Sequence, residues 1–303
     1  MTPFIPTEGI HRDLPADAYH AVKAASASYL KVLDVSPAHC LAAIEEEKKS
    51  TPDKDFGTAC HCAILEPDLF GKLYSVADQC SAITGKGSRC ESNGRVRMAD
   101  GKWLCGTHMK GKGMEIPAQD FIALSPENFD KAQLIGESVR RHPAAREILE
   151  AASDIELSAF WRDGETGVLQ KLRTDIVIAS AGIVADLKTT QDASPEGFSK
   201  AVWDYRYDLS AANYLRGLHI TYQPFNKFQF IAMEKVPPFA VAVYQLDNDD
   251  IYRGMEELDR LLAIWDHCEK NPAEWHRAYS LEVQQIGIPA WARKRQSVFA
   301  EAD

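Results

Sequence analysis

Two aspartates and a lysine are spaced so that a β-hairpin would bring them together. Ten residues separate Asp175 from Asp186, and Lys188 follows two positions later. Apolar and polar residues alternate on both flanks, which predicts strands over 168–180 and 183–188. The intervening Ser180-Ala181-Gly182 is a turn signal, because glycine tolerates a positive φ. In such a hairpin Asp175 lies opposite Asp186, with Cβ atoms about 5 Å apart.

A patch of this composition can bind a divalent cation. Lys188 shares the face of Asp186, because side chains alternate along a strand. Carboxylate oxygens suit Mg²⁺, which keeps several waters and takes substrate phosphates as further ligands. A lysine beside the ion can orient or help deprotonate the attacking water. On an arbitrary hairpin the same residues form a solvated polar face with weak ion pairs, so the spacing alone leaves both interpretations open.

The pattern resembles the core motif of PD-(D/E)XK nucleases, in which an aspartate ends one strand and an acidic-x-lysine triplet lies on the next. Here the triplet is Asp186-Leu187-Lys188. Further segments are similar to the exonuclease VIII (RecE) family of these nucleases. They are the Gly57-Thr58-Ala59-Cys60-His61 helix with its Leu65-Glu66-Pro67 end, the N-terminal helix around residues 27–39, the strand and exit at 186–194, and the segments 228–238 and 288–291. The resemblance covers most of residues 10–293, with one interruption.

The resemblance implies a fold and a set of roles. The fold is α/β, a PD-(D/E)XK nuclease core with a central mixed β-sheet flanked by helices. The family pattern makes His61, Asp175 and Asp186 ligands of a catalytic Mg²⁺ or Mn²⁺, adds the backbone carbonyl of Leu187, and makes Lys188 the catalytic lysine. A helical histidine without this context is more often a core residue than a ligand.

The implied activity is Mg²⁺-dependent digestion of linear double-stranded DNA from the 5′ end, which exposes a 3′ single strand for recombination. A single-strand annealing protein and a homo-oligomeric ring are the implied partners. Two alternatives stay open. One is a RecB-like nuclease with the other polarity or a single-strand or flap substrate. The other is a catalytically weak, zinc-stabilised DNA-binding protein, which is mildly favoured by Ser210, because the family carries a glutamine there.

The interruption contains a second candidate metal site. Its spacing is Cys80-x₉-Cys90-x₁₄-Cys105-x₂-His108. Three thiolates and an imidazole form a set that structural Zn²⁺ accepts, and the glycine-rich segment has little core of its own, so a metal would supply folding energy. The alternatives are a floppy insertion with unrelated thiols and, more weakly, an iron–sulfur cluster. The insertion is also basic, which suits either a DNA backbone or a solubilising surface. Its basic residues are Lys86, Arg89, Arg95, Arg97, Lys102, Lys110 and Lys112.

Bulk properties narrow the class of protein. The 303 residues carry a net charge of −10, which argues against non-specific coating of nucleic acid but allows a local binding groove. No apolar run is long enough for a membrane span, and the N-terminus has no secretory signal pattern, so we expect a cytoplasmic protein that does not contact membranes. We expect residues 1–75 to form the N-terminal helical part of the nuclease domain, 76–116 the zinc-binding insertion and 117–303 the nuclease core.

Local signals predict the remaining elements. Helices are expected over 28–48 with a break at Pro37, over 55–65, and over 129–149 with a break at Pro143. Helices are also expected from Ser194, over 208–217 and over 248–270, with Ser28 and Asn248 as N-caps. Strands are expected over 155–161, 227–233 and 239–246. We expect four cysteines to pack as small apolar residues, namely Cys40, Cys60, Cys62 and Cys268. Glu66, Glu156, Tyr205 and Tyr207 fit either a site or a structural role.

Overall fold

The computed structural model describes residues 6–46, 51–111 and 121–289. Four predicted features lie outside these residues: the end of the first helix at Lys48, Lys112 of the basic insertion, the end of the insertion at residue 116, and the closing residues 290–291.

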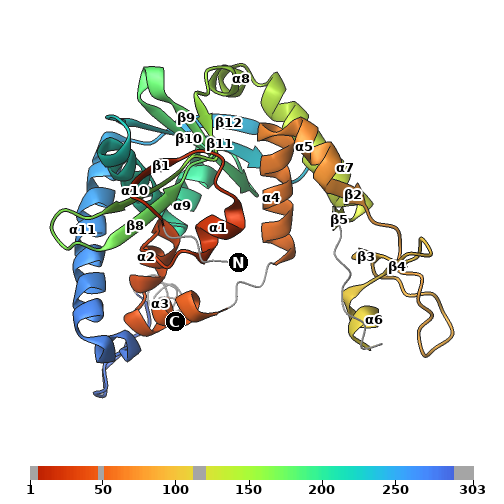
Figure 1. The fold of residues 1–303 in the computed structure, drawn as a ribbon, viewed down its shortest axis with the longest axis horizontal. Coiled ribbons are helices and arrows are strands. Elements are labelled where there is room, and N and C mark those ends of the chain that lie inside the picture. Colours follow the sequence, from red (N-terminus) through yellow and green to blue (C-terminus); the bar gives the residue numbers. More distant parts are fainter. Residues whose placement is uncertain (1–5, 47–50, 112–120, 290–303) are drawn as a thin grey trace, which may run out of the picture.

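A five-stranded mixed sheet forms the centre of the fold (Figure 1). Its strands lie in the order β12 (Val241–Gln245), β11 (Lys227–Glu234), β10 (Ile183–Thr190), β9 (Ile176–Ile178) and β6 (Asp154–Ile155). The pair β10–β11 is parallel, and the other pairs are antiparallel. A second sheet has three strands, β1 (Gly9–His11), β7 (Ser158–Arg162) and β8 (Leu169–Arg173). The expected α/β class with a mixed sheet is therefore confirmed.

The strand predicted over 168–180 is divided between the two sheets. It breaks at residues 174–175 into β8 and β9. The strand predicted over 155–161, which pairs with it, is likewise divided into β6 and β7. The register does not slip, because Ile155 pairs with Ile176 and Ser158 pairs with Arg173. The ladder bends at Glu156, whose φ of 52° lies in the left-handed region that most residues avoid. Regular alternation in the sequence hides this bend.

Helices cover both faces of the five-stranded sheet and form two cores. One core joins α4 (Pro52–Leu65), α7 (Pro126–Arg141) and α8 (Pro143–Glu150) to the side of β10 that carries Leu187. The other joins α9 (Pro195–Asp204) and α10 (Tyr207–Thr221) to the side that carries Phe230. Outside α10 lie α2 (Ala27–Leu33) and α11 (Asn248–Lys270), packed together around Leu258.

Most helix boundaries agree with the sequence signals. Proline opens both α3 (Pro37–Glu45) and α8, so the expected breaks are confirmed. Two caps differ from the prediction. Ser26 rather than Ser28 caps α2, because its extended backbone lets the hydroxyl accept from the amide of Tyr29. Asp247 rather than Asn248 caps α11, where it accepts from the amide of Asp249.

The interrupting segment projects from the body as an arm (Figure 1). The chain leaves through α5 (Pro67–Leu73) and β2 (Tyr74–Val76) and returns through β5 (Ile122–Leu124), which pairs with β2 in parallel. Between them lie β3 (Val96–Arg97), β4 (Trp103–Leu104) and α6 (Gly106–Gly111). The division at residues 76 and 116 stays a prediction. Helices α2 and α4, which lie in the segment predicted over 1–75, pack in the same hydrophobic cores as elements of the segment predicted over 117–303.

Candidate active site and metal centres

The predicted hairpin brings its acidic residues together. Pairs between β9 and β10 run up to Ala185 with Ile176, so the next step of the register places Asp186 opposite Asp175. The turn forms as the sequence indicates, with Gly182 at a φ of 64° after a short 3₁₀ turn. The carboxylate of Asp175 accepts from the backbone amide of Leu187 at 2.6 Å. Lys188 forms an ion pair with Asp186, on the same strand face.

Helix α4 contributes His61 to the same place. Its Nδ1 lies 3.5 Å from Oδ1 of Asp175. The helix is fixed by its Thr51 cap and by Phe56 and Ala59, which belong to the core against the sheet. All four side chains expected at the site therefore converge. His61 comes from α4, Asp175 from the break between β8 and β9, and Asp186 and Lys188 from β10. Their roles as metal ligands and catalyst stay a prediction.

Burial and mutual charge shift the pKa values of these groups. Burial and the charge of Asp175 raise the pKa of Asp186 to about 6, although Lys188 opposes the shift. Burial also disfavours ionised Asp175, yet His61 and Lys188 together hold the pKa of that carboxyl well below its usual range. Burial would lower the pKa of Lys188, but the two aspartates raise it above its ordinary value. Lys188 is therefore an ammonium at neutral pH.

The structure adds a residue that the sequence left undecided. The donor atoms of Glu156, His61 and Asp175 lie within 4.8 Å of one another. Burial and Asp175 raise the pKa of Glu156, while an ion pair of 2.5 Å with Arg173 opposes that shift. The backbone amide of Glu156 donates to the carbonyl of Asp175, so the two residues face each other across the bent ladder. Glu156 belongs to the site.

A polar cavity of about 560 Å³ borders the site on the side of Glu156. Arg12 and Arg173 line it, and each is paired with an acid. Glu66, the other undecided glutamate, lines the same cavity. It lies outside the compact donor group formed by His61, Glu156 and Asp175.

The donor set fits a hard divalent cation. Carboxylate oxygens and one imidazole are ligands that Mg²⁺ and Mn²⁺ accept. The raised pKa values of Glu156 and Asp186 report repulsion and burial that a cation among them would relieve. The predicted ligand set was His61, Asp175 and Asp186. In the structure the third member of the compact donor group is Glu156, and Asp186 is paired with Lys188.

The four predicted zinc ligands also converge. The Sγ atoms of Cys90 and Cys105 are 4.0 Å apart, and Nδ1 of His108 lies 3.2 Å from Sγ of Cys105 and 3.6 Å from Sγ of Cys80. Two sulfurs bound tetrahedrally at about 2.3 Å from zinc would be roughly 3.8 Å apart. The donor types and these separations fit structural zinc. The surrounding core is small, built from the cysteines with Val96, Leu104 and Met109.

The remaining cysteines are structural, as expected. Cys40, Cys60 and Cys268 are buried, and Cys62 packs against a core from a half-buried position. Ser210 is 7% exposed, so little of it faces solvent. Among the described residues, no helix is long and apolar enough to cross a membrane.

These features define an α/β protein with helices on both faces of a mixed sheet and an acidic, lysine-containing site at the bend of a β-hairpin. A family model described as a PDDEXK-like domain of unknown function (DUF3799) matches residues 26–283, and the chain belongs to this family. A comparison of the chain with curated proteins found no match.

Two solved structures are similar. One is a candidate exonuclease from Eubacterium rectale, with a TM-score of 0.50 and 13% identity, covering 92% of this chain and 97% of that one. The other is a phage-related exonuclease from Haemophilus somnus 129PT, with a TM-score of 0.32 and 11% identity, covering 82% and 96%. At 13% identity the first likeness concerns the fold alone, and the second carries no argument.

Proposed function

We propose that the protein is a metal-dependent DNA exonuclease of the exonuclease VIII type, which digests linear duplex DNA from the 5′ end and leaves a 3′ single strand. The observation that carries the proposal is the convergence of His61, Asp175, Asp186 and Lys188 with Glu156 at one bend of the sheet. Membership of the PDDEXK-like family supports it, and so does the exonuclease description of the similar fold from Eubacterium rectale.

The chain's own residues have distinct parts in this proposal. His61, Asp175 and Glu156 would hold a divalent cation, with Asp186 beside them and the carbonyl of Leu187 as a further donor. Such an ion would supply Lewis-acid chemistry, polarising a phosphate and making water a better nucleophile. Lys188 donates to water or to a phosphate oxygen, because its raised pKa keeps it an ammonium. Arg173 forms an ion pair with Glu156 and opposes the rise in the pKa of that carboxyl.

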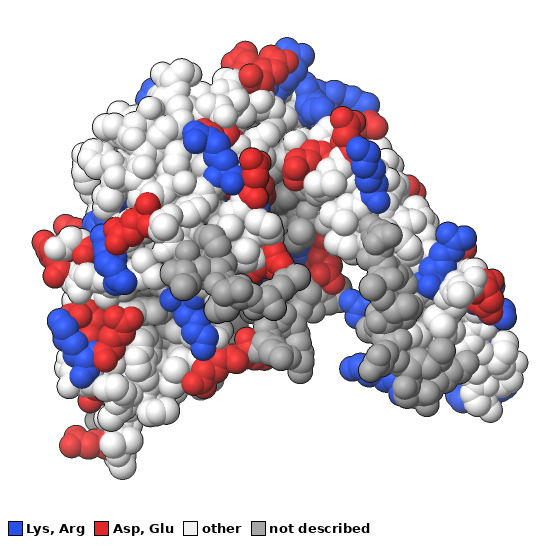
Figure 2. All heavy atoms as spheres, viewed as in Figure 1, with Lys and Arg blue, Asp and Glu red and all other residues white. Residues whose placement is uncertain are grey.

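The surface is compatible with a nucleic acid lying between the site and the arm. Figure 2 shows the molecule hollowed between the body and the arm, with Lys and Arg side chains along the arm. Helix α4, which carries His61, is the part of the body that faces the arm (Figure 1). Arg95 of the arm lies 3.8 Å from Asp55 near the start of α4 and is 70% exposed. A zinc held by Cys80, Cys90, Cys105 and His108 would keep this arm folded.

Hydrolysis of matched DNA substrates tests the proposal. The protein with Mg²⁺ should digest linear duplex and spare a nicked circle, and a 5′ label should be released first. Asp186→Ala should abolish digestion while it spares folding and most DNA binding, and Glu127→Ala, which removes an exposed acid on α7, should change nothing. Release of the 3′ label first would indicate a RecB-like enzyme. A folded wild type that behaves like Asp186→Ala would indicate a DNA-binding protein without this activity.

A protein that exposes 3′ strands would be expected to work with a single-strand annealing protein and as a homo-oligomer. Both follow from the exonuclease VIII resemblance. Sedimentation of the purified chain would test the oligomer, and co-purification with a single-strand annealing protein would test the partner.

A further inference from the structure

Two large aromatic side chains are exposed where α9 meets α10, close to the catalytic lysine. We call residues 203–207 the aromatic corner. Trp203 is 59% exposed and Tyr205 is 62% exposed, whereas most aromatic side chains of the two cores are buried. Exposing apolar rings has a solvation cost, and the corner begins at the end of α9, the helix that comes after the catalytic strand β10. Its position suggests a ligand that shares the site.

The corner is continuous with the site through stacked rings. Tyr205 and Tyr207 lie with centroids 5.7 Å apart and planes 26° from parallel. The ammonium of Lys188 is 5.1 Å from the centre of the Tyr207 ring, and the ammonium of Lys31, on α2, is 5.3 Å from it. The exposed ring of Tyr205 and the half-buried ring of Tyr207 thus lead from the surface to the catalytic lysine, with Lys31 beside them.

Lys31 adds a positive charge to this path. Among the described residues, no carboxylate oxygen lies within 4 Å of its ammonium, whereas Arg173 and Lys188 are each paired with a carboxylate. Burial and the neighbouring Lys188 lower the pKa of Lys31 to about 8. A phosphate beside Lys31 would oppose the effects of burial and of Lys188, because an anion favours the charged form of the lysine.

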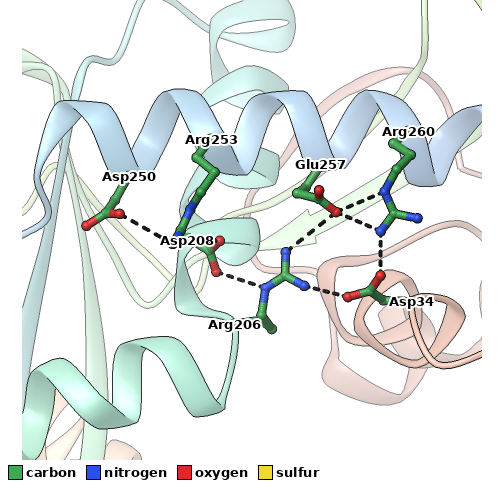
Figure 3. Close-up of polar contacts among 7 residues, drawn as sticks. All are labelled: Asp34, Arg206, Asp208, Asp250, Arg253, Glu257 and Arg260. Atoms are coloured by element: carbon green, nitrogen blue, oxygen red, sulfur yellow. Dashed lines mark hydrogen bonds and ion pairs between the residues drawn. The ribbon is translucent and has the colours of Figure 1, made fainter. Parts of the chain in front are cut away.

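An ion-pair network holds the corner in shape. Arg206, at its centre, has a φ of 50°, a conformation that an arginine adopts only when its surroundings enforce it. Its guanidinium pairs with Asp34, Asp208 and Glu257. Asp208, only 1% exposed, also binds Arg253 (Figure 3). The guanidinium of Arg253 in turn lies 5.1 Å from the ring centre of Trp203. The network fixes the backbone from which the exposed rings project.

We propose that the aromatic corner binds a single-stranded segment of nucleic acid next to the scissile phosphate. The rings of Tyr205 and Trp203 stack on bases, and Lys31 binds a backbone phosphate. Stacking on side chains requires bases that are free of their duplex neighbours, and aromatic rings beside basic residues are the usual means of binding such strands. The proposal rests on the proposed function, because it assigns a substrate form to the same site.

Binding of two probes to the full-length protein tests the proposal. A short fluorescent oligothymidylate and an abasic oligonucleotide of equal length carry the same phosphates, and only the first carries bases. Affinities are measured by anisotropy with Ca²⁺ in place of Mg²⁺, and gels establish that the probes stay intact. Wild type should prefer oligothymidylate by about fivefold or more, the lower end for one stacked base. Tyr205→Leu and Trp203→Leu should bring this ratio toward one.

Two further variants separate stacking from charge and from general surface effects. Tyr252→Leu removes a tyrosine of α11 that is 69% exposed and should keep the preference. Lys31→Met should weaken both probes equally and reduce the slope of log affinity against log salt by roughly 0.7, the value for one phosphate of a single strand. Both Lys31→Met and the corner variants are checked by thermal unfolding.

The proposal is overturned if wild type binds the two probes alike, if Tyr252→Leu is as harmful as Tyr205→Leu, or if Lys31→Met leaves the salt slope unchanged. It is also overturned if Trp203→Leu dissociates an oligomer in sedimentation and leaves the ratio intact, because the corner is then a protein interface. Digestion of DNA by a wild type without base preference refutes the corner alone. Absence of both digestion and binding refutes the proposed function as well.

Discussion

Replacing Gly254 by alanine should weaken the packing that positions the site. In isolation, glycine to alanine in a helix interior stabilises by up to about 1 kcal/mol. Here a Cβ on Gly254 would lie 2.5 Å from the carbonyl oxygen of Asp208 and 3.2 Å from the Cβ of Ala212. The first contact is with backbone, so α10 and α11 must separate. Overpacking of this kind costs about 1–3 kcal/mol, and we expect a net loss of about 1–2 kcal/mol.

Chemical denaturation followed by circular dichroism measures the loss. Gly71→Ala is the matched control, because Gly71 lies in α5 and an added Cβ there meets nothing within 4 Å. The control should be neutral or slightly stabilising. The two variants differ only in what the new methyl group touches, so their difference isolates the helix contact.

The same change should reach the site. Asp208 follows Tyr207, whose ring contacts Lys188, so a displaced start of α10 should lower DNA hydrolysis further than unfolding accounts for. If Gly254→Ala is as stable as Gly71→Ala, the close helix contact is wrong. If its stability falls while hydrolysis by the folded fraction is unchanged, the link between α10 and the site is wrong.

Three further outcomes test the metals and Lys31. Cys105→Ser should lose bound zinc in elemental analysis and loosen the arm, whereas Cys62→Ser, outside the cluster, should keep it; retained zinc in Cys105→Ser contradicts the ligand set. Asp175→Asn should retain zinc and lower kcat/KM for DNA at least about 100-fold, the effect of several kcal/mol of lost transition-state stabilisation; near-normal activity contradicts its role. Lys31→Met should be more stable than wild type by at most about 3 kcal/mol below pH 8. Burial lowers the folded-state pKa of Lys31 from 10.5 to about 8, so the unfolded chain binds more protons than the folded chain between these pH values. The stability of wild type should therefore rise from pH 8 to pH 10.5, and the stability difference between Lys31→Met and wild type should shrink over that range. A difference that does not change over this range contradicts the buried charge.

Local chemistry made much of the fold predictable. The hairpin register follows from a ten-residue separation and from a glycine that accepts a φ of 64°. Prolines mark where α3 and α8 begin. The cluster of Cys80, Cys90, Cys105 and His108 could be predicted from the ligand types and their spacing, because three thiols and an imidazole in a glycine-rich segment fit a structural metal site.

The bend at Glu156 could not be predicted from alternation, because alternating residues continue through 174–175 where the strand changes sheets. One signal was present. The turn after Arg162 pairs that residue with Leu169, and continuing the register brings Glu156 opposite Asp175. The sequence left Tyr205 and Tyr207 open between a site and a structural role. Their exposure could not be predicted, because it depends on Arg206 being held by Asp34 at the end of α2 and by Glu257 of α11.

The register places three acids in one row across neighbouring strands. Like charges directly opposite each other destabilise a sheet, so the row needs compensation. Each acid pairs with a different cationic or ionisable side chain: Glu156 with Arg173, Asp175 with His61, and Asp186 with Lys188. The fold therefore balances part of the repulsion in the row with its own residues, and a divalent cation would compete with these partners for the carboxylates. The thiol cluster has a much smaller core around it. A catalytic ion that exchanges and a structural ion that stays are thus what the two sites favour.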